Sequence, residues 1–116
     1  AELKNKTGDT GGAIADLNLI RERAGCSPYS GEVDGDLANA IQDERDREFF
    51  CEGVSIRYFD IVRSGMFRER LRGNFKTLTD QDVADGALFV PVGELAFSDN
   101  TLMRQTPYWK RNGFDN

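Results

Sequence analysis

The sequence predicts a mainly α-helical fold, made of tetratricopeptide-like helical hairpins that are joined by long ordered loops. Two stretches, residues 13–24 and 37–52, repeat their inward-facing positions at the helical period. Gly25 and Gly53 stand directly after them, as glycines often do at helix C-termini. Since a repeat array needs about three such hairpins, these helices alone do not establish one.

The N-terminal part of the chain is predicted to form the first hairpin. Residues 1–6 resemble the last turns of a helix, and the following turn offers Asp9 or Thr10 as the N-cap of the next helix. That helix has an apolar face, which consists of Ala13, Ile14, Leu17, Ile20 and Ala24. Residues 26–35 are expected to form a loop, and Asp36 to cap the central helix.

The central helix carries charge where core side chains are expected. Leu37 and Ile41 start an apolar stripe. The positions that continue this stripe are charged, namely Glu44, Arg45, Glu48 and Glu52. Carboxylates spaced four apart repel one another, more strongly when buried, so they require cations. The residues expected on the solvated face are Gln42, Asp43, Asp46 and Arg47.

A second, shorter helix is predicted over residues 55–63, closed by Gly65, with Ile56, Phe59 and Val62 on its apolar face. It brings further charges to the hairpin, because Arg57 and Arg63 can neutralise the glutamates and Asp60 can share these arginines. We therefore predict a structural charge network that consists of Glu44, Arg45, Glu48, Glu52, Arg57, Asp60 and Arg63.

The C-terminal half is predicted to contain little regular structure. Helical turns are expected over 66–71 and 94–97, and an extended run over 88–92, before and after a proline. Residues 74–86 are expected to be mostly irregular, although residues 76–80 could start a short helical turn. The tail from residue 101 is expected to be a loop.

Charge and composition exclude several function classes. The 116 residues carry a net charge of −5, which argues against non-specific binding to nucleic acid or to an anionic membrane. The chain has no histidine, so a Ser-His-Asp site cannot be formed within it, and we expect no metal and no cofactor. Cys26 and Cys51 are expected to be small buried residues, with a disulfide between them as the alternative.

Two observations bear on ligand chemistry. Glu44, Glu48 and Glu52 could suggest a glycosidase pair, but neighbouring arginines hold such carboxylates ionised, so we expect no enzyme activity. Aromatic side chains are the usual platforms for sugars, and Tyr108 and Trp109 are the candidate ligand-binding residues. The alternative, which we favour, is that these two rings pack the tail onto the helices.

Three stretches resemble the SusD/RagB family. The pattern E-R-x-x-E-x-x-x-E-G-x-x-x-x-x-x-D-x-x-R-x-G is formed by Glu44, Arg45, Glu48, Glu52, Gly53, Asp60, Arg63 and Gly65. Residues 17–25 resemble the family's L-N-x-[IV]-R-x-R-A-G segment. The family's P-I-P-x-x-E-L ending is resembled by Val90, Pro91, Val92, Glu94 and Leu95, followed by Asn100, Leu102, Gln105, Pro107 and Tyr108. The chain departs from the family's usual residues at Val92, Gly93, Thr101 and Thr106.

The resemblance implies that residues 1–116 are a single C-terminal SusD/RagB-like domain, or a fragment of a larger protein. It implies a cell-surface lipoprotein of the bacterial outer membrane that binds glycans or other nutrients. Such a protein delivers its ligand to a TonB-dependent, SusC-like transporter and touches the membrane only through a lipid anchor outside this fragment. The main sugar contacts are implied to lie largely outside this region. The alternative is a tetratricopeptide-like module for protein–protein interaction.

Overall fold

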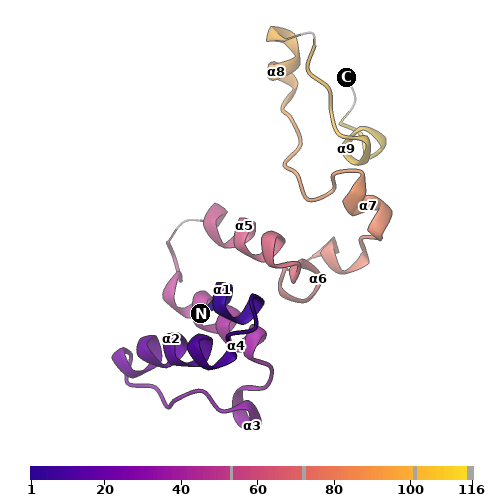
Figure 1. Ribbon diagram of the computed structural model, residues 1–116. Helices are drawn as coiled ribbons and strands as arrows, with labels where there is room; N and C mark the ends of the chain where they lie inside the picture. Colours follow the sequence, from indigo (N-terminus) through magenta and orange to yellow (C-terminus); the bar gives the residue numbers. More distant parts are fainter. Residues whose placement is uncertain (53, 72, 101, 115–116) are drawn as a thin grey trace. The chain divides into compact units, whose positions relative to one another are not determined.

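The computed structural model describes residues 1–52, 54–71, 73–100 and 102–114, and within these ranges it is helical without any strand (Figure 1). The predicted mainly α fold is therefore confirmed. The elements are α1 (Glu2–Lys6), α2 (Thr10–Arg23), α3 (Gly31–Asp34), α4 (Leu37–Glu48), α5 (Val54–Ser64), α6 (Phe67–Arg70), the 3-10 helix η1 (Asn74–Thr77), α7 (Asp80–Ala84), α8 (Glu94–Asp99) and α9 (Pro107–Arg111). No described helix has both the length and the apolar character that a membrane span needs.

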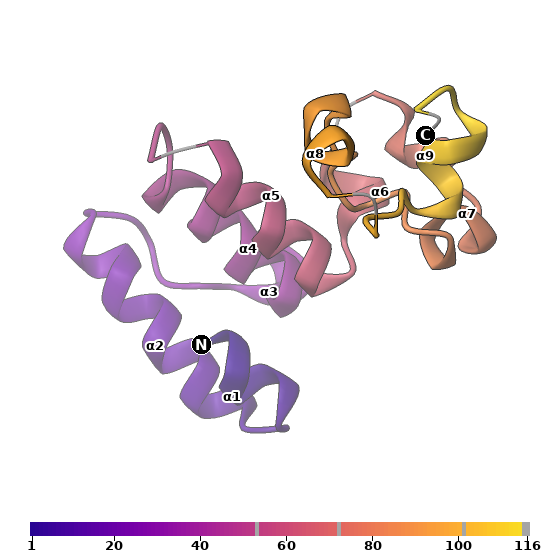
Figure 2. The same ribbon diagram turned by 90° about the horizontal axis from the view of Figure 1, so that it is seen from above.

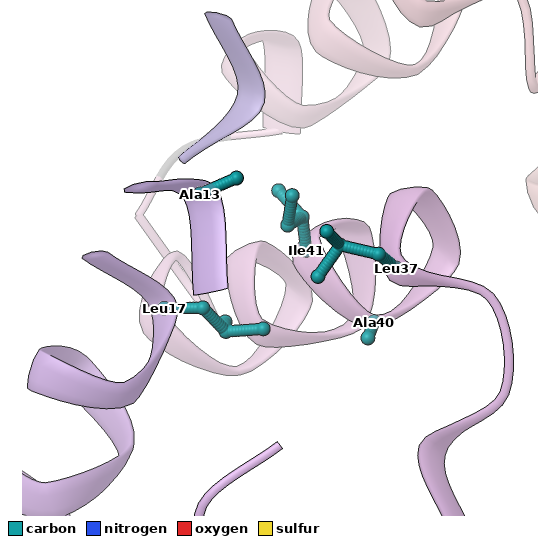
Figure 3. Close-up of a cluster of buried hydrophobic side chains, with 5 residues drawn as sticks. All are labelled: Ala13, Leu17, Leu37, Ala40 and Ile41. Carbon is teal, nitrogen blue, oxygen red and sulfur yellow. The ribbon is translucent and has the colours of Figure 1, made fainter. Parts of the chain in front are cut away.

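The chain divides into two compact units, Ala1–Arg57 and Tyr58–Asn116. In the first unit, α1, α2 and α4 pack against one another, as both views show (Figure 1 and Figure 2). Ala13 and Leu17 of α2 point toward α4 (Figure 3). There they meet Leu37, Ala40 and Ile41. This cluster is the core that the apolar faces of residues 13–24 and 37–41 predict.

Two helices of this unit begin at the expected caps. The Asp9 carboxylate accepts a hydrogen bond of 2.9 Å from the Gly12 amide and so caps α2. A Cβ at Gly12 would lie only 2.2 Å from that carboxylate, which explains why glycine suits this position. Asp36 caps α4 in the same way, through a 3.1 Å bond from the Asn39 amide.

Several local expectations for this unit are wrong. The expected loop over 26–35 contains α3, and α4 ends at Glu48 instead of reaching residue 52. The residues after Glu48 turn sharply, because Cys51 takes a left-handed φ of 65° that no helix continues. Cys26 and Cys51 are both exposed free thiols, so their expected burial is wrong and the structure shows no disulfide between them. Gly53, the expected end of the longer helix, lies outside the described residues.

In the second unit the buried apolar side chains include Ile61 of α5 and Phe67 of α6. The inward side of α5 is therefore not the predicted one, since Ile56 and Phe59 are exposed. The expected irregular and loop regions contain η1, α7 and α9. Helix α7 has a full capping box between Thr79 and Asp82, a sequence signal that could have predicted it.

Candidate ligand pocket and charge network

The second unit contains a pocket of about 410 Å³ with aromatic walls. The rings come from α5, η1, the segment after α7, and α9, namely Tyr58, Phe75, Phe89, Tyr108 and Trp109. Leu78, Ala87, Val90 and Pro91 complete the apolar part of the lining. Both sequence candidates, Tyr108 and Trp109, thus lie at this pocket.

Two of the rings are fixed by hydrogen bonds from their polar ends. The indole Nε1 of Trp109 donates to the Phe89 carbonyl at 2.6 Å, and the Tyr58 hydroxyl donates to the Leu88 carbonyl at 2.5 Å. Burial raises the pKa of the Tyr58 hydroxyl, so this group stays protonated and remains a donor. Both bonds hold residues 88–89 at the wall. The Trp109 ring also makes T-shaped contacts with the rings of Tyr108 and Phe114, at centroid distances of 5.1 Å and 5.2 Å.

Helix α9 is anchored to α7, beside which it lies in both views (Figure 1 and Figure 2). The Tyr108 amide donates to the Asp85 carbonyl at 3.0 Å, and Arg111 donates to the carboxylates of Asp82 and Asp85. The Arg111 guanidinium is the main cause that lowers the pKa of Asp85. For Asp82, bonds from Thr79 lower the pKa first and Arg111 adds to them. Pro107 stands at the first position of α9, which favours its start.

The pocket lining contains no charged side chain among the described residues. Its polar groups are the amides of Asn74 and Asn112, both on exposed residues. The Asn112 side chain donates to the Tyr108 carbonyl at 2.8 Å through Nδ2, so Oδ1 is the atom that can accept from a ligand. The arrangement suits a neutral ligand with an apolar face and hydroxyl groups.

In the first unit, Glu44 is the most deeply buried acid of the predicted network, with 5% of its surface exposed. Its carboxylate accepts a 2.9 Å bond from Arg47, which the sequence had placed on the solvated face. Glu48 is half-buried and pairs with Arg23 of α2. These partners were not expected, because an amphipathic projection of one helix does not show what the preceding helix or a long exposed side chain contributes.

Arg57 binds a buried polar side chain of α4, that of Gln42. Its guanidinium donates to Gln42 Oε1 at 3.0 Å and to Asp46 at 2.6 Å. Gln42 was expected on the solvated face but is only 2% exposed, so that expectation is wrong. A buried amide needs such a donor, and Arg57 supplies it.

The remaining network residues range from half-buried to exposed, with the Asp60 side chain 14% exposed and the Arg63 side chain 52% exposed. Asp60 and Arg63 form an ion pair of 3.2 Å within α5. The Arg45 guanidinium lies 5.1 Å from the centre of the Phe49 ring, a cation–π distance. Glu52 lies beyond α4 and is exposed. The structural role of the full set of seven stays a prediction.

A further ion pair was not predicted. Arg21 of α2 is buried and donates to Asp34 of α3 at 3.0 Å, while Asp34 also accepts from the Ser30 amide. The bond from Arg21 is the main cause that lowers the pKa of Asp34, and the Ser30 amide adds to it. The sequence signal was present, since Arg21 falls beside Leu17 on the inward face of the helix.

Comparison with known proteins agrees with the three motif stretches. The model of the SusD family matches residues 1–109. Comparison with curated proteins gave no match, and neither did comparison with solved structures. The family match includes α1 to α8 and most of the pocket lining. With all but the last seven residues matched, the chain belongs to the SusD family.

Proposed function

We propose that this chain is the C-terminal part of a cell-surface lipoprotein that binds a glycan or another nutrient and delivers it to a TonB-dependent, SusC-like transporter. The observation that carries the proposal is the family match over residues 1–109. Membership of the SusD family supports a nutrient-binding role of the SusD/RagB type. The family consists of binding proteins that are not enzymes and that are generally surface lipoproteins.

The charge pattern agrees with binding without catalysis. Glu44 and Glu48, which could suggest acid–base chemistry, each form an ion pair with an arginine in the first unit. A glycosidase requires two carboxyl groups that flank the bond to be cleaved, and among the described residues no carboxyl group lines the aromatic pocket. We therefore propose that the chain binds its ligand without cleaving it.

A second candidate function rests on a groove in the first unit. It has a volume of about 330 Å³ and lies among α1, α2 and α4, with Leu17, Ile41 and Phe49 in its lining. Helical hairpins with such a groove can bind a peptide, as a tetratricopeptide-like interaction module would. The family match favours nutrient binding over this alternative.

Isolation of the protein from its own membrane tests the proposal. The tagged protein would be purified with mild detergent from the outer membrane of the cells that make it, with an unrelated tagged surface lipoprotein as the control. The proposal predicts that a TonB-dependent transporter co-purifies in comparable amounts and that the protein incorporates labelled fatty acid. Recovery of the protein without lipid and without a transporter would contradict it.

A further inference from the structure

We propose that the aromatic pocket of residues 58–112 binds one neutral sugar ring of the transported glycan, with Phe89 and Trp109 as its stacking faces. This inference rests on the proposed function and gives it a contact site within this chain. The pocket volume of about 410 Å³ falls within the range of about 300–1,000 Å³ that ligand sites occupy.

The lining chemistry selects the class of ligand. A sugar ring has a face of C–H groups, which is attracted to the negative face of an aromatic ring, and hydroxyl groups around its edge. The pocket offers five aromatic rings, with Asn74 and Asn112 at exposed positions where amides can bond to hydroxyls. A charged sugar or a charged peptide side chain would lose water here without gaining an ion pair.

The exposure of Phe89 also indicates a ligand. Its side chain is 67% exposed although it lines the pocket, and its neighbour Val90 is 71% exposed. The Phe89 backbone is nevertheless held in place by Trp109, which donates to its carbonyl. Burial of this exposed apolar ring by a ligand is favourable, and the held backbone lowers the cost of ordering it.

The chain allows a direct measurement, because Trp109 is its one tryptophan. Its fluorescence therefore reports on this pocket alone. The 116-residue chain would be titrated with maltohexaose, cellohexaose, xylohexaose and mannohexaose. Oligogalacturonate serves as the charged control ligand, and a capped phenylalanine tripeptide serves as the apolar peptide control. We expect a saturable change with at least one neutral oligosaccharide and none with oligogalacturonate.

Two variants decide whether the binding occurs at the proposed faces. Phe89→Ala should weaken binding about tenfold or more, equivalent to about 1.4 kcal/mol. Leu95→Ala removes an apolar side chain of the same unit that is 82% exposed and outside the pocket, so it should leave the affinity unchanged. Circular dichroism of both variants confirms that the helices are retained.

Several results would overturn the assignment: no saturable change with any neutral oligosaccharide, equal weakening in both variants, preference for the peptide, or calorimetric binding that leaves Trp109 emission unaltered.

The proposed sugar contact and the proposed function can be contradicted independently of each other. Co-purification of the transporter without binding at this pocket removes the sugar contact and leaves the proposed function standing. Loss of the transporter and lipid removes the proposed function, whatever this titration shows.

Discussion

Replacing Arg47 by alanine tests whether the charge network stabilises the first unit. The Arg47 side chain is 59% exposed and that of its partner Glu44 is 7% exposed. A fully exposed pair contributes about 0–1 kcal/mol, and removing one partner of a fully buried pair costs about 3–5 kcal/mol. Because one partner is buried and the other is not, we expect Arg47→Ala to cost about 1–3 kcal/mol of unfolding free energy.

The same replacement in a Glu44→Gln background isolates the ionic part of this cost. Glutamine keeps the shape of Glu44 but removes the buried charge that Arg47 stabilises. Arg47→Ala should then cost only about 0–1 kcal/mol, so the coupling between the two sites should be about 1–2 kcal/mol. Helix propensity cannot account for a loss of stability in Arg47→Ala, since alanine is at least as favourable as arginine within a helix.

Urea denaturation followed by far-ultraviolet circular dichroism measures these differences. Arg23→Ala is the matched control, because Arg23 is similarly exposed and its partner Glu48 is less buried than Glu44. The midpoint for this control should move much less than that of Arg47→Ala. Equal small shifts for the two arginine variants, or an unchanged cost of Arg47→Ala in the Glu44→Gln background, would refute the reasoning.

Two further predictions concern pH and backbone. Since Arg21 lowers the pKa of Asp34 in the folded chain, the stability from this pair should be present above the unfolded pKa of about 4 and be lost as the pH falls through the lower folded value. As the pH is lowered, the urea midpoint of Asp34→Asn should therefore fall less steeply than that of the original chain. Gly86 has a φ of +91°, and an added Cβ would lie 2.8 Å from the Thr106 side chain. Gly86→Ala should thus lower the urea midpoint, followed by Trp109 emission, more than Gly65→Ala does. Gly65 also has a positive φ, but a Cβ added there would meet no atom within 4 Å.

Each of these predictions has a clear contrary result. An Asp34→Asn chain with the same acid dependence as the original would show that the ion pair does not link pH to stability. Equal shifts for the two glycine variants would show that backbone strain alone, and not contact with Thr106, decides the cost at residue 86.

The parts of the fold that were predictable are those with a local signal. The cap residues Asp9 and Asp36 were found because short acidic side chains before an apolar periodic segment satisfy helix amides. The cluster of Leu17 with Ile41 followed from the apolar periodicity of their two helices. Both signals act within a few residues of the chain, so one sequence suffices to find them.

The parts that were missed depend on partners far apart in the sequence. The burial of Gln42 follows from its bond to Arg57, fifteen positions later, and no pattern around Gln42 indicates it. Tyr108 and Trp109 could be proposed by residue type, but their shared pocket with Phe75 and Phe89 requires the tertiary fold. The early end of α4 was missed because the charges after Glu44 fit a helical stripe equally well whether or not the helix continues.

Binding and product formation, measured together on protein isolated from the outer membrane, test the nutrient-binding account most directly. Calorimetry would follow the binding of the oligosaccharides or peptides on which the cells grow, and chromatography of the same samples would detect shorter products. The account predicts saturable binding of at least one nutrient with no product. No saturable binding of any nutrient, or product release that Glu48→Gln abolishes, would contradict it.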